Sequence, residues 1–203
     1  MGKVISDMSM SLDGFIVGPN DGPENGLGDG GEALHDWIWG GTTDRSAASP
    51  LTSAKDSNRE VMDEWVEGLG AVIMGRWSFD IAEAAWGDNP PFHVPVFVLT
   101  HKPKERLVKD GGTTFTFVTD GIESALSQAQ VAAGDKNVHL HGASSAQQLL
   151  KAGLLDEIQI HLVPVLLGGG KRLLDSIGKH IELEKTRVID SPGVTHLRFR
   201  VIK

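Results

Sequence analysis

The sequence predicts an α/β fold in a single domain over residues 1–203. Short apolar runs typical of buried strands alternate with segments whose apolar residues recur at helical spacing. Two of these strands end on a glycine, Gly75 and Gly142, and turn directly into a helix. The chain finishes with two alternating segments around Ser191–Gly193, which predicts an antiparallel strand pair. Strands that alternate with helices in this way are typical of a parallel sheet covered by helices.

The composition excludes several classes of protein. The chain contains no cysteine, so disulfides, thiolate catalysis and cysteine-ligated zinc are excluded, and we expect no metal site. Its formal net charge is −8 without any basic block, which argues against nucleic acid as a partner. No apolar run approaches the length of a membrane span and no secretory leader precedes the first strand. We therefore expect a cytoplasmic protein with no membrane partner.

The first predicted elements are a strand over Lys3–Met10 and an extended run over Phe15–Val17. The turn Ser11–Gly14 joins them. Asp13 in this turn either satisfies backbone donors alone or faces a bound cofactor.

A segment without a clear core element follows, over Gly18–Asp56. A loop of this length in a compact domain is typical of a lid or of disorder. Its residues 26–31 match the pattern G-x-G-x-x-G, but turn-forming residues rather than a strand precede them. We therefore reject this match as a dinucleotide fingerprint. Trp37 and Trp39, farther along, either cap the core or pack over a planar substrate.

The junction at Gly75 predicts one wall of a site for an anionic cofactor. Ser57–Glu60 is typical of a capping box and predicts a helix that leads to the buried strand Ala71–Met74. Gly75 lets a ligand approach the backbone, and the first N–H groups of the next helix face the end of this strand. Arg76 adds a positive charge suited to a phosphate group.

The remaining elements repeat this arrangement. Strands are predicted over Val94–Thr100, Thr113–Asp120 and Asn137–Gly142, with helices over Ile122–Ala133 and Ala146–Ala152. His101 and Lys102 follow the first of these strands, at a position equivalent to that of Arg76. Gly142–Ser145 forms the second strand–glycine–helix junction, which favours a bound pyrophosphate. An ordinary helix cap explains Ser144 or Ser145 equally well.

The last part of the chain predicts three strands. A long strand is expected over residues 155–167, with Pro164 at a bulge or an edge. Gly168–Lys171 resembles the tail of a phosphate-binding loop, but Arg172 stands where that motif requires serine or threonine. Strands over Ile181–Asp190 and Val194–Ile202 close the chain. His196, Arg198 and Arg200 alternate with apolar residues, which predicts one solvated, charged face.

Five short motifs occur in one order along nearly the whole chain: Ser11-Leu12-Asp13-Gly14, Met74-Gly75-Arg76, Val98-Leu99-Thr100, Gly142-Ala143-Ser144 and Leu162–Gly168. In this order the sequence resembles the riboflavin-biosynthesis reductase C-terminal domain family, within the dihydrofolate-reductase-like superfamily. The resemblance implies a three-layer fold, in which a central, mostly parallel sheet is flanked by helices. Bifunctional members carry a zinc deaminase domain in front, so the resemblance here is to a stand-alone reductase.

The resemblance also implies that NADPH is the hydride donor. It implies that phosphate groups are held by Gly75, Arg76 and Ser78, and that the adenosine 2′-phosphate lies near Leu99, Thr100 and His101. The pyrophosphate would be held by Gly142, Ala143, Ser144 and Ser145. The nicotinamide would be flanked by Asp13 and by the segment that contains Val165 and Leu167.

The implied activity is reduction of a C=N or C=O group in a small heterocyclic or sugar-amine substrate, resembling that of 5-amino-6-(5-phosphoribosylamino)uracil reductase. Asp13 is the first candidate for the catalytic group, as a proton donor or an orienting group, and Glu60 is the second. Residues 18–56 would close over the substrate and select it.

Two alternatives stay open at this point. A dihydrofolate reductase requires a carboxylate that faces a pterin, which Glu60 or Asp63 would supply. A nucleotide-binding protein without turnover would bind NADPH and not oxidise it. A homodimer is expected from the family and from the apolar run Leu162–Leu167, although that run is equally consistent with an internal core strand.

Overall fold

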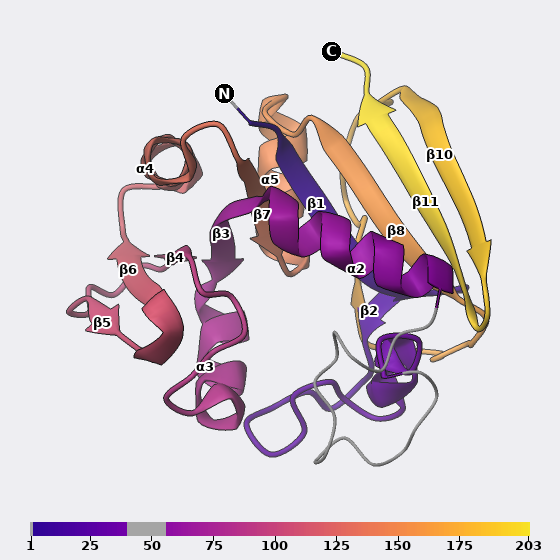
Figure 1. The fold of residues 1–203 in the computed structure, drawn as a ribbon, viewed down its shortest axis with the longest axis horizontal. Helices are drawn as coiled ribbons and strands as arrows, with labels where there is room; N and C mark the ends of the chain where they lie inside the picture. Colours follow the sequence, from indigo (N-terminus) through magenta and orange to yellow (C-terminus); the bar gives the residue numbers. More distant parts are fainter. Residues whose placement is uncertain (1, 40–55) are drawn as a thin grey trace.

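The computed structural model describes residues 2–39 and 56–203, which form three layers around a central sheet (Figure 1). The sheet has nine strands in the order β10-β11-β8-β1-β7-β3-β4-β6-β5. Their bounds, in chain order, are β1 Val4–Ser11, β3 Leu69–Gly75, β4 Pro95–Leu99, β5 Leu107–Val108, β6 Thr114–Val118, β7 Asn137–His141, β8 Glu157–Val163, β10 Leu183–Ser191 and β11 Val194–Val201.

Most of this sheet is parallel. Strands β8, β1, β7, β3, β4 and β6 pair in parallel, so their carboxyl ends meet at one edge. Strands β11 and β10 continue the sheet in antiparallel pairing, and β5 pairs antiparallel with β6. A separate antiparallel pair joins β2 (Phe15–Val17) to β9 (Lys171–Arg172). The predicted α/β fold with an antiparallel C-terminal strand pair is confirmed.

Four α-helices among the described residues cover the two faces of the sheet. They are α2 (Asp56–Gly68), α3 (Arg76–Trp86), α4 (Ile122–Ala133) and α5 (Ala143–Ala152). The 3-10 helices η1 (Gly31–His35) and η2 (Asp110–Gly112) lie in connecting segments. Figure 1 shows α2 crossing in front of the sheet, over β1 and β8, with α5 behind it. None of the described helices is long and apolar enough to cross a membrane.

Alternation along β7 shows how the two faces differ. Val138 and Leu140 belong to the apolar cluster that α4 and α5 cover. His139 and His141 point to the other face, where His139 meets Trp65 of α2 edge-on and His141 meets Trp86 of α3. The face beneath α2 and α3 therefore contains buried polar side chains.

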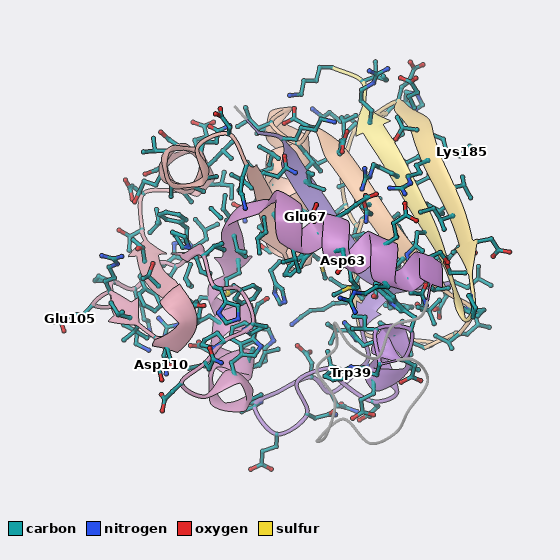
Figure 2. All side chains as sticks on the ribbon, in the orientation of Figure 1. Trp39, Asp63, Glu67, Glu105, Asp110 and Lys185 are labelled. Carbon is teal, nitrogen blue, oxygen red and sulfur yellow. The ribbon has the colours of Figure 1, made fainter. Side chains whose placement is uncertain are left out.

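The segment that contains the tryptophans is part of the core as far as the structure describes it. Leu34 and Trp37 are buried with Val163 and Val194 in a small apolar cluster. The core-cap interpretation of Trp37 is confirmed. Trp39 lies beside η1, beneath α2 in the view of Figure 2. The rest of the predicted loop, residues 40–55, lies outside the described residues.

Two predicted boundaries shift for local physical reasons. Helix α5 begins at Ala143, three residues before the predicted start, because Gly142 with φ 95° already supplies the turn out of β7. The long strand predicted over residues 155–167 was wrong at its end, because β8 stops at Val163. Pro164 has no N–H group to continue the ladder, and the chain turns so that Val165 donates to the Val163 carbonyl at 2.8 Å.

Two predictions about α2 and β11 were wrong. Ser57 lies inside α2, where its hydroxyl contacts that of Ser191 at 2.6 Å, so it forms no capping box with Glu60. The alternating face of β11 is solvated at Arg200 but not at His196, which is only 3% exposed and contacts Asn58 of α2. Arg198 on the same face is held by Glu64 of α2 at 3.1 Å. Figure 2 places Asp63 and Glu67 on α2 in front of the sheet and Lys185 on the edge strand β10.

Candidate active site

A cleft of about 740 Å³ lies at the carboxyl ends of four neighbouring strands of the sheet. Gly75 ends β3, Leu99 ends β4, Thr119 follows β6 and Gly142 follows β7, and all four line the cleft. Ligands of α/β proteins bind at this edge, because the loops and helix N-termini that follow the strands gather there.

Three helices begin at the wall of this cleft. Gly75, Gly121 and Gly142 all line it, and each is the residue immediately before a helix: α3, α4 and α5 respectively. The first N–H groups of a helix have no intrahelical partner, and the helix dipole adds a partial positive charge there. Three such ends around one cleft favour an anionic ligand such as a nucleotide phosphate.

The glycines at the two predicted junctions have different reasons to be glycine. Gly142 adopts φ 95°, and a Cβ atom there would lie 2.8 Å from the Ser78 hydroxyl. The fold itself therefore requires glycine at position 142. Gly75 has φ −78° and ψ 157°, which any residue adopts, and a Cβ atom there would meet no atom within 4 Å. The fold leaves open space in front of Gly75, at the wall of the cleft.

Some charged side chains of the cleft form ion pairs, and others have no ion-pair partner among the described residues. Arg76 contacts Asp80, one turn later in α3, with 2.7 Å between Nε and Oδ1. Among the described residues, His101 and Lys102 line the cleft, are exposed and have no ion-pair partner. Thr100 closes the turn that carries them, because its hydroxyl accepts from the Lys102 N–H at 3.1 Å.

A second cluster joins the early loop to α3 and to β9. Oδ2 of Asp21 accepts from Lys171 at 2.5 Å and from the indole N–H of Trp77 at 2.6 Å. The Lys171 ammonium also lies 5.1 Å from the centre of a Trp77 ring. Partial burial works to raise the pKa of Asp21, but the hydrogen bonds from Lys171 and Trp77 outweigh it and lower the pKa. Asp21 is therefore a carboxylate that fastens the loop across one side of the cleft.

The structure brings most of the predicted cofactor residues together at this cleft. The residues that line it are Gly75, Arg76, Ser78, Leu99, Thr100, His101, Gly142, Ala143 and Ser144. Ser145 does not line it, because its side chain is buried and its hydroxyl donates to the Gly142 carbonyl at 3.2 Å. Val165 and Leu167 also lie elsewhere, packed against the cluster that contains Leu34 and Trp37.

Asp13 is held in place by hydrogen bonds that it accepts. Its carboxylate accepts from the Ser11 hydroxyl at 2.6 Å and from the backbone N–H groups of Leu167 at 3.1 Å and Gly168 at 2.7 Å. The hydrogen bond from Ser11, with those from the two backbone groups, lowers the pKa of Asp13. A carboxylate with these partners orients the turn at residues 164–168 and is poorly suited to donate a proton.

Glu60 is not brought to the cleft. Its Oε1 accepts from Arg187 of the edge strand β10 at 3.1 Å, and its side chain is 63% exposed. Strand β10 lies at the opposite end of the sheet order from β4 and β6, whose ends frame the cleft. The acid that a pterin would require is therefore not supplied by Glu60 in this arrangement.

Sequence reasoning missed Asp21, Trp77 and Lys171 as residues of the cleft. The Gly168–Lys171 run was the available signal for Lys171, since its glycines permit the close approach of β9 to β2. Within residues 2–39 and 56–203, no three histidine, aspartate or glutamate side chains are grouped so as to hold a metal ion.

Residues 2–196 match the model of a known family, the RibD C-terminal domain. The chain belongs to the RibD C-terminal domain family. The uncharacterized protein YyaP of Bacillus subtilis (strain 168) is 26% identical over 208 residues, which cover 96% of this chain and 93% of YyaP.

Solved structures show the same fold over the whole chain. A putative riboflavin biosynthesis protein from Shewanella sp. PV-4 matches with a TM-score of 0.71 and 21% identity, and each chain is covered completely. A dihydrofolate reductase from Enterococcus faecalis, complexed with NADP(H), matches with a TM-score of 0.58 and 11% identity over 100% of this chain and 98% of that one. The fold is therefore dihydrofolate-reductase-like, as the sequence motifs indicate.

Proposed function

We propose that this protein is an NADPH-dependent reductase that acts on a C=N or C=O group of a small heterocyclic or sugar-amine substrate. Membership of the RibD C-terminal domain family supports an oxidoreductase, and resemblance to 5-amino-6-(5-phosphoribosylamino)uracil reductase supports the substrate class. The observation that carries the proposal is the open space before Gly75, bordered by helix N-termini and Arg76.

The residues of the cleft fit a phosphorylated dinucleotide. NADPH supplies a hydride when it is bound. The N-termini of α3 and α5, with Arg76 and Ser78, provide donors for phosphate oxygens. Lys102 provides charge without a competing carboxylate, beside the His101 ring, which suits the additional 2′-phosphate that distinguishes NADPH from NADH. Ile16 and Val17 supply an apolar surface to the cleft.

The alternatives have less support. Dihydrofolate reduction loses both candidate acids, because Glu60 pairs with Arg187 and Asp63 pairs with Arg59, and neither lines the cleft. Binding of a nucleotide without turnover is distinguished by a substrate screen. The cytoplasmic location and the homodimer stay predictions, as does the small-molecule substrate. Of the apolar run considered for the dimer, Leu166 is 71% exposed and follows the end of β8.

Fluorescence titration with NADPH and with NADH tests the proposal. The variant is Arg76→Ala, and the matched control is Arg59→Ala, since Arg59 forms the same i,i+4 ion pair on α2 away from the cleft. A hydrogen bond to a charged group contributes about 1.5–3 kcal/mol, so we expect Arg76→Ala to weaken NADPH binding by about 10- to 150-fold. Arg59→Ala should bind like the wild type, and NADH more weakly than NADPH. Failure of the wild type to bind either nucleotide would refute the proposal.

A further inference from the structure

The hairpin formed by β10 and β11 turns its apolar side away from α2. On β11, His196 and Arg198 face α2, which contacts both of them through its own polar side chains. Leu197 and Phe199 alternate with these residues and therefore point to the opposite side of the sheet, where they lie against the main apolar cluster. Antiparallel strands commonly have one side packed on the core and the other in water. In this hairpin α2 covers the polar side instead.

The part of the chain that the structure describes covers the apolar side only in part. Helices α4 and α5 pack mainly on β3, β4 and β7, and Figure 1 shows α5 behind β7 and β1 rather than behind the hairpin. Ile177 and Ile181, which precede β10, pack against the same cluster and cover some of this side. Val188 of β10 is nevertheless 50% exposed, and Leu183 is 39% exposed. An apolar sheet side left open in this way is typical of an interaction surface.

The pairing register defines which side chains make up this surface. Directly opposed residues of neighbouring strands point to the same side of a sheet. Three such pairs lie on the apolar side of the hairpin: Phe199 with Lys185, Leu197 with Val188, and Thr195 with Asp190. We call these six residues the hairpin face. Its middle pair is apolar, and its outer strand carries one positive and one negative side chain.

These two charges lie at equal distances from Val188. The bulge between Lys185 and Arg187 places an additional residue in β10, so Lys185 lies two pairing positions before Val188, as Asp190 lies two after it. Two positions correspond to about 7 Å along a strand. Neither Lys185 nor Asp190 has an ion-pair partner within residues 2–39 and 56–203, whereas Arg187 is paired with Glu64. Figure 2 shows Lys185 at the outer margin of the molecule.

We propose that the hairpin face binds a second copy of this chain about a two-fold axis that lies between the two faces and crosses the strands at Val188. Rotation about this axis reverses the strand direction, so Lys185 of each copy meets Asp190 of the other. The apolar middle of the face then packs on the same residues of the second copy, as two aligned sheets do at a separation of about 10 Å. An axis along the strands would bring like charges to the same level. The charge pattern therefore selects the crossing axis.

The size of the hairpin face predicts a reversible dimer. Its two strands lie about 4.8 Å apart, and the nine residues of β10 extend over about 30 Å, so the face measures about 10 by 30 Å. A stable dimer of standard size buries about 800 Å² on each partner, which is more than this face supplies alone. We therefore expect association in the micromolar range, which dilution reverses.

The proposed dimer leaves the cleft open. Strands β8 and β1 separate the hairpin from β7, which is the nearest strand of the sheet whose end contributes to the cleft, through Gly142. Association and nucleotide binding should therefore be independent of each other. The dimer does not depend on the proposed function, and its test requires no substrate.

Sedimentation velocity of the full chain, at concentrations below and above the micromolar range, tests the charge pairing. Lys185→Asp leaves only acidic groups at the outer positions and Asp190→Lys only basic ones, so each variant alone should weaken the dimer by about 10-fold or more. An equal mixture of the two variants should form a heterodimer, because every acidic group then faces a basic one. The double variant should dimerise like the wild type. Glu105→Lys is the control, since it makes the same charge change at an exposed position far from the hairpin.

Cross-linking distinguishes packing of the faces from pairing of two β10 edges, which would also bring Lys185 to Asp190. The chain contains no cysteine, so Leu197→Cys supplies a single thiol in each copy. The two thiols lie about 10 Å apart when the faces pack and about 14 Å apart, or three strand spacings, when the edges pair. A bismaleimide that spans about 10 Å should therefore link the Leu197→Cys dimer and leave Val131→Cys, at an exposed position on α4, unlinked.

Circular dichroism verifies that each variant folds. A wild type that is monomeric at every concentration would overturn the proposal. Undiminished dimerisation of Lys185→Asp and Asp190→Lys, or a mixture that forms no heterodimer, would overturn it as well. Failure of Leu197→Cys to cross-link while the charge variants behave as expected would show that the edges pair and that the face does not bind.

Discussion

Gly75→Ala is the most specific perturbation of the candidate cofactor site. Gly75 has φ −78° and ψ 157°, so alanine fits its backbone without strain. The added methyl group would meet no protein atom within 4 Å. Alanine is a poorer N-cap than glycine, by up to about 1 kcal/mol, but it lowers the entropy of the unfolded chain, which offsets this by about 0.4–1 kcal/mol. We therefore expect the free energy of unfolding to change by less than about 0.5 kcal/mol.

The effect on NADPH binding should be much larger, because the methyl group enters the space that the proposal assigns to a phosphate. An additional methyl group in a well-packed contact costs about 1–3 kcal/mol, which corresponds to about 5- to 150-fold weaker binding. Isothermal titration calorimetry with NADPH measures this, and urea unfolding measures stability. Gly22→Ala is the matched control, since its Cβ atom would also meet nothing and Gly22 lies outside the cleft. Wild-type affinity in Gly75→Ala would refute the assignment of this space to the cofactor.

Two further predictions concern stability. Phe79 is fully buried and packs edge-on against Phe115 and Phe117, with 5.1 Å between ring centres. Phe79→Ala should therefore lower the free energy of unfolding, measured in urea, by about 3–5 kcal/mol. The control Val131→Ala, at an exposed position, should lower it by less than about 0.5 kcal/mol. Burial lowers the pKa of His141 to about 4, so the unfolded chain binds a proton there between about pH 6.5 and 4 while the folded protein does not. This contribution to the free energy of unfolding should be fully present above pH 6.5, and about 3 kcal/mol of it should be lost as the pH falls to 4. His141→Phe should lose less stability over the same range. An equal slope of unfolding free energy against pH in both proteins would contradict this reasoning.

The elements of the fold were predictable where local patterns decide them. Ala71–Met74 is an uninterrupted apolar run because helices cover both faces of β3, so no residue alternates toward solvent. The strand–glycine–helix junctions at Gly75 and Gly142 are also local, since a few consecutive residues form the strand end, the turn and the helix start. The side of the cleft that these junctions build was therefore visible in the sequence.

The polar interior was not predictable from local patterns. On β11, His196 and Arg198 alternate with apolar residues, a pattern that is equally typical of a solvated face and of a face covered by polar partners. The partner of His196 on α2, Asn58, is 138 residues away, and Asp7 is 154 residues from His161. Only the sheet order, which places β8 between β1 and β11, brings these side chains together.

This difference explains why the sequence indicates a cofactor more clearly than a chemical step. Backbone N–H groups at helix starts bind phosphate through short motifs, which are legible one at a time. The buried polar chain beneath α2 instead joins a carboxylate, two imidazoles and an amide, and four separate elements supply them. Changing any one of Asp7, His161, His196 or Asn58 removes at least one of its contacts. These four residues can therefore be interpreted only together, and patterns around any single one of them could not predict the chain.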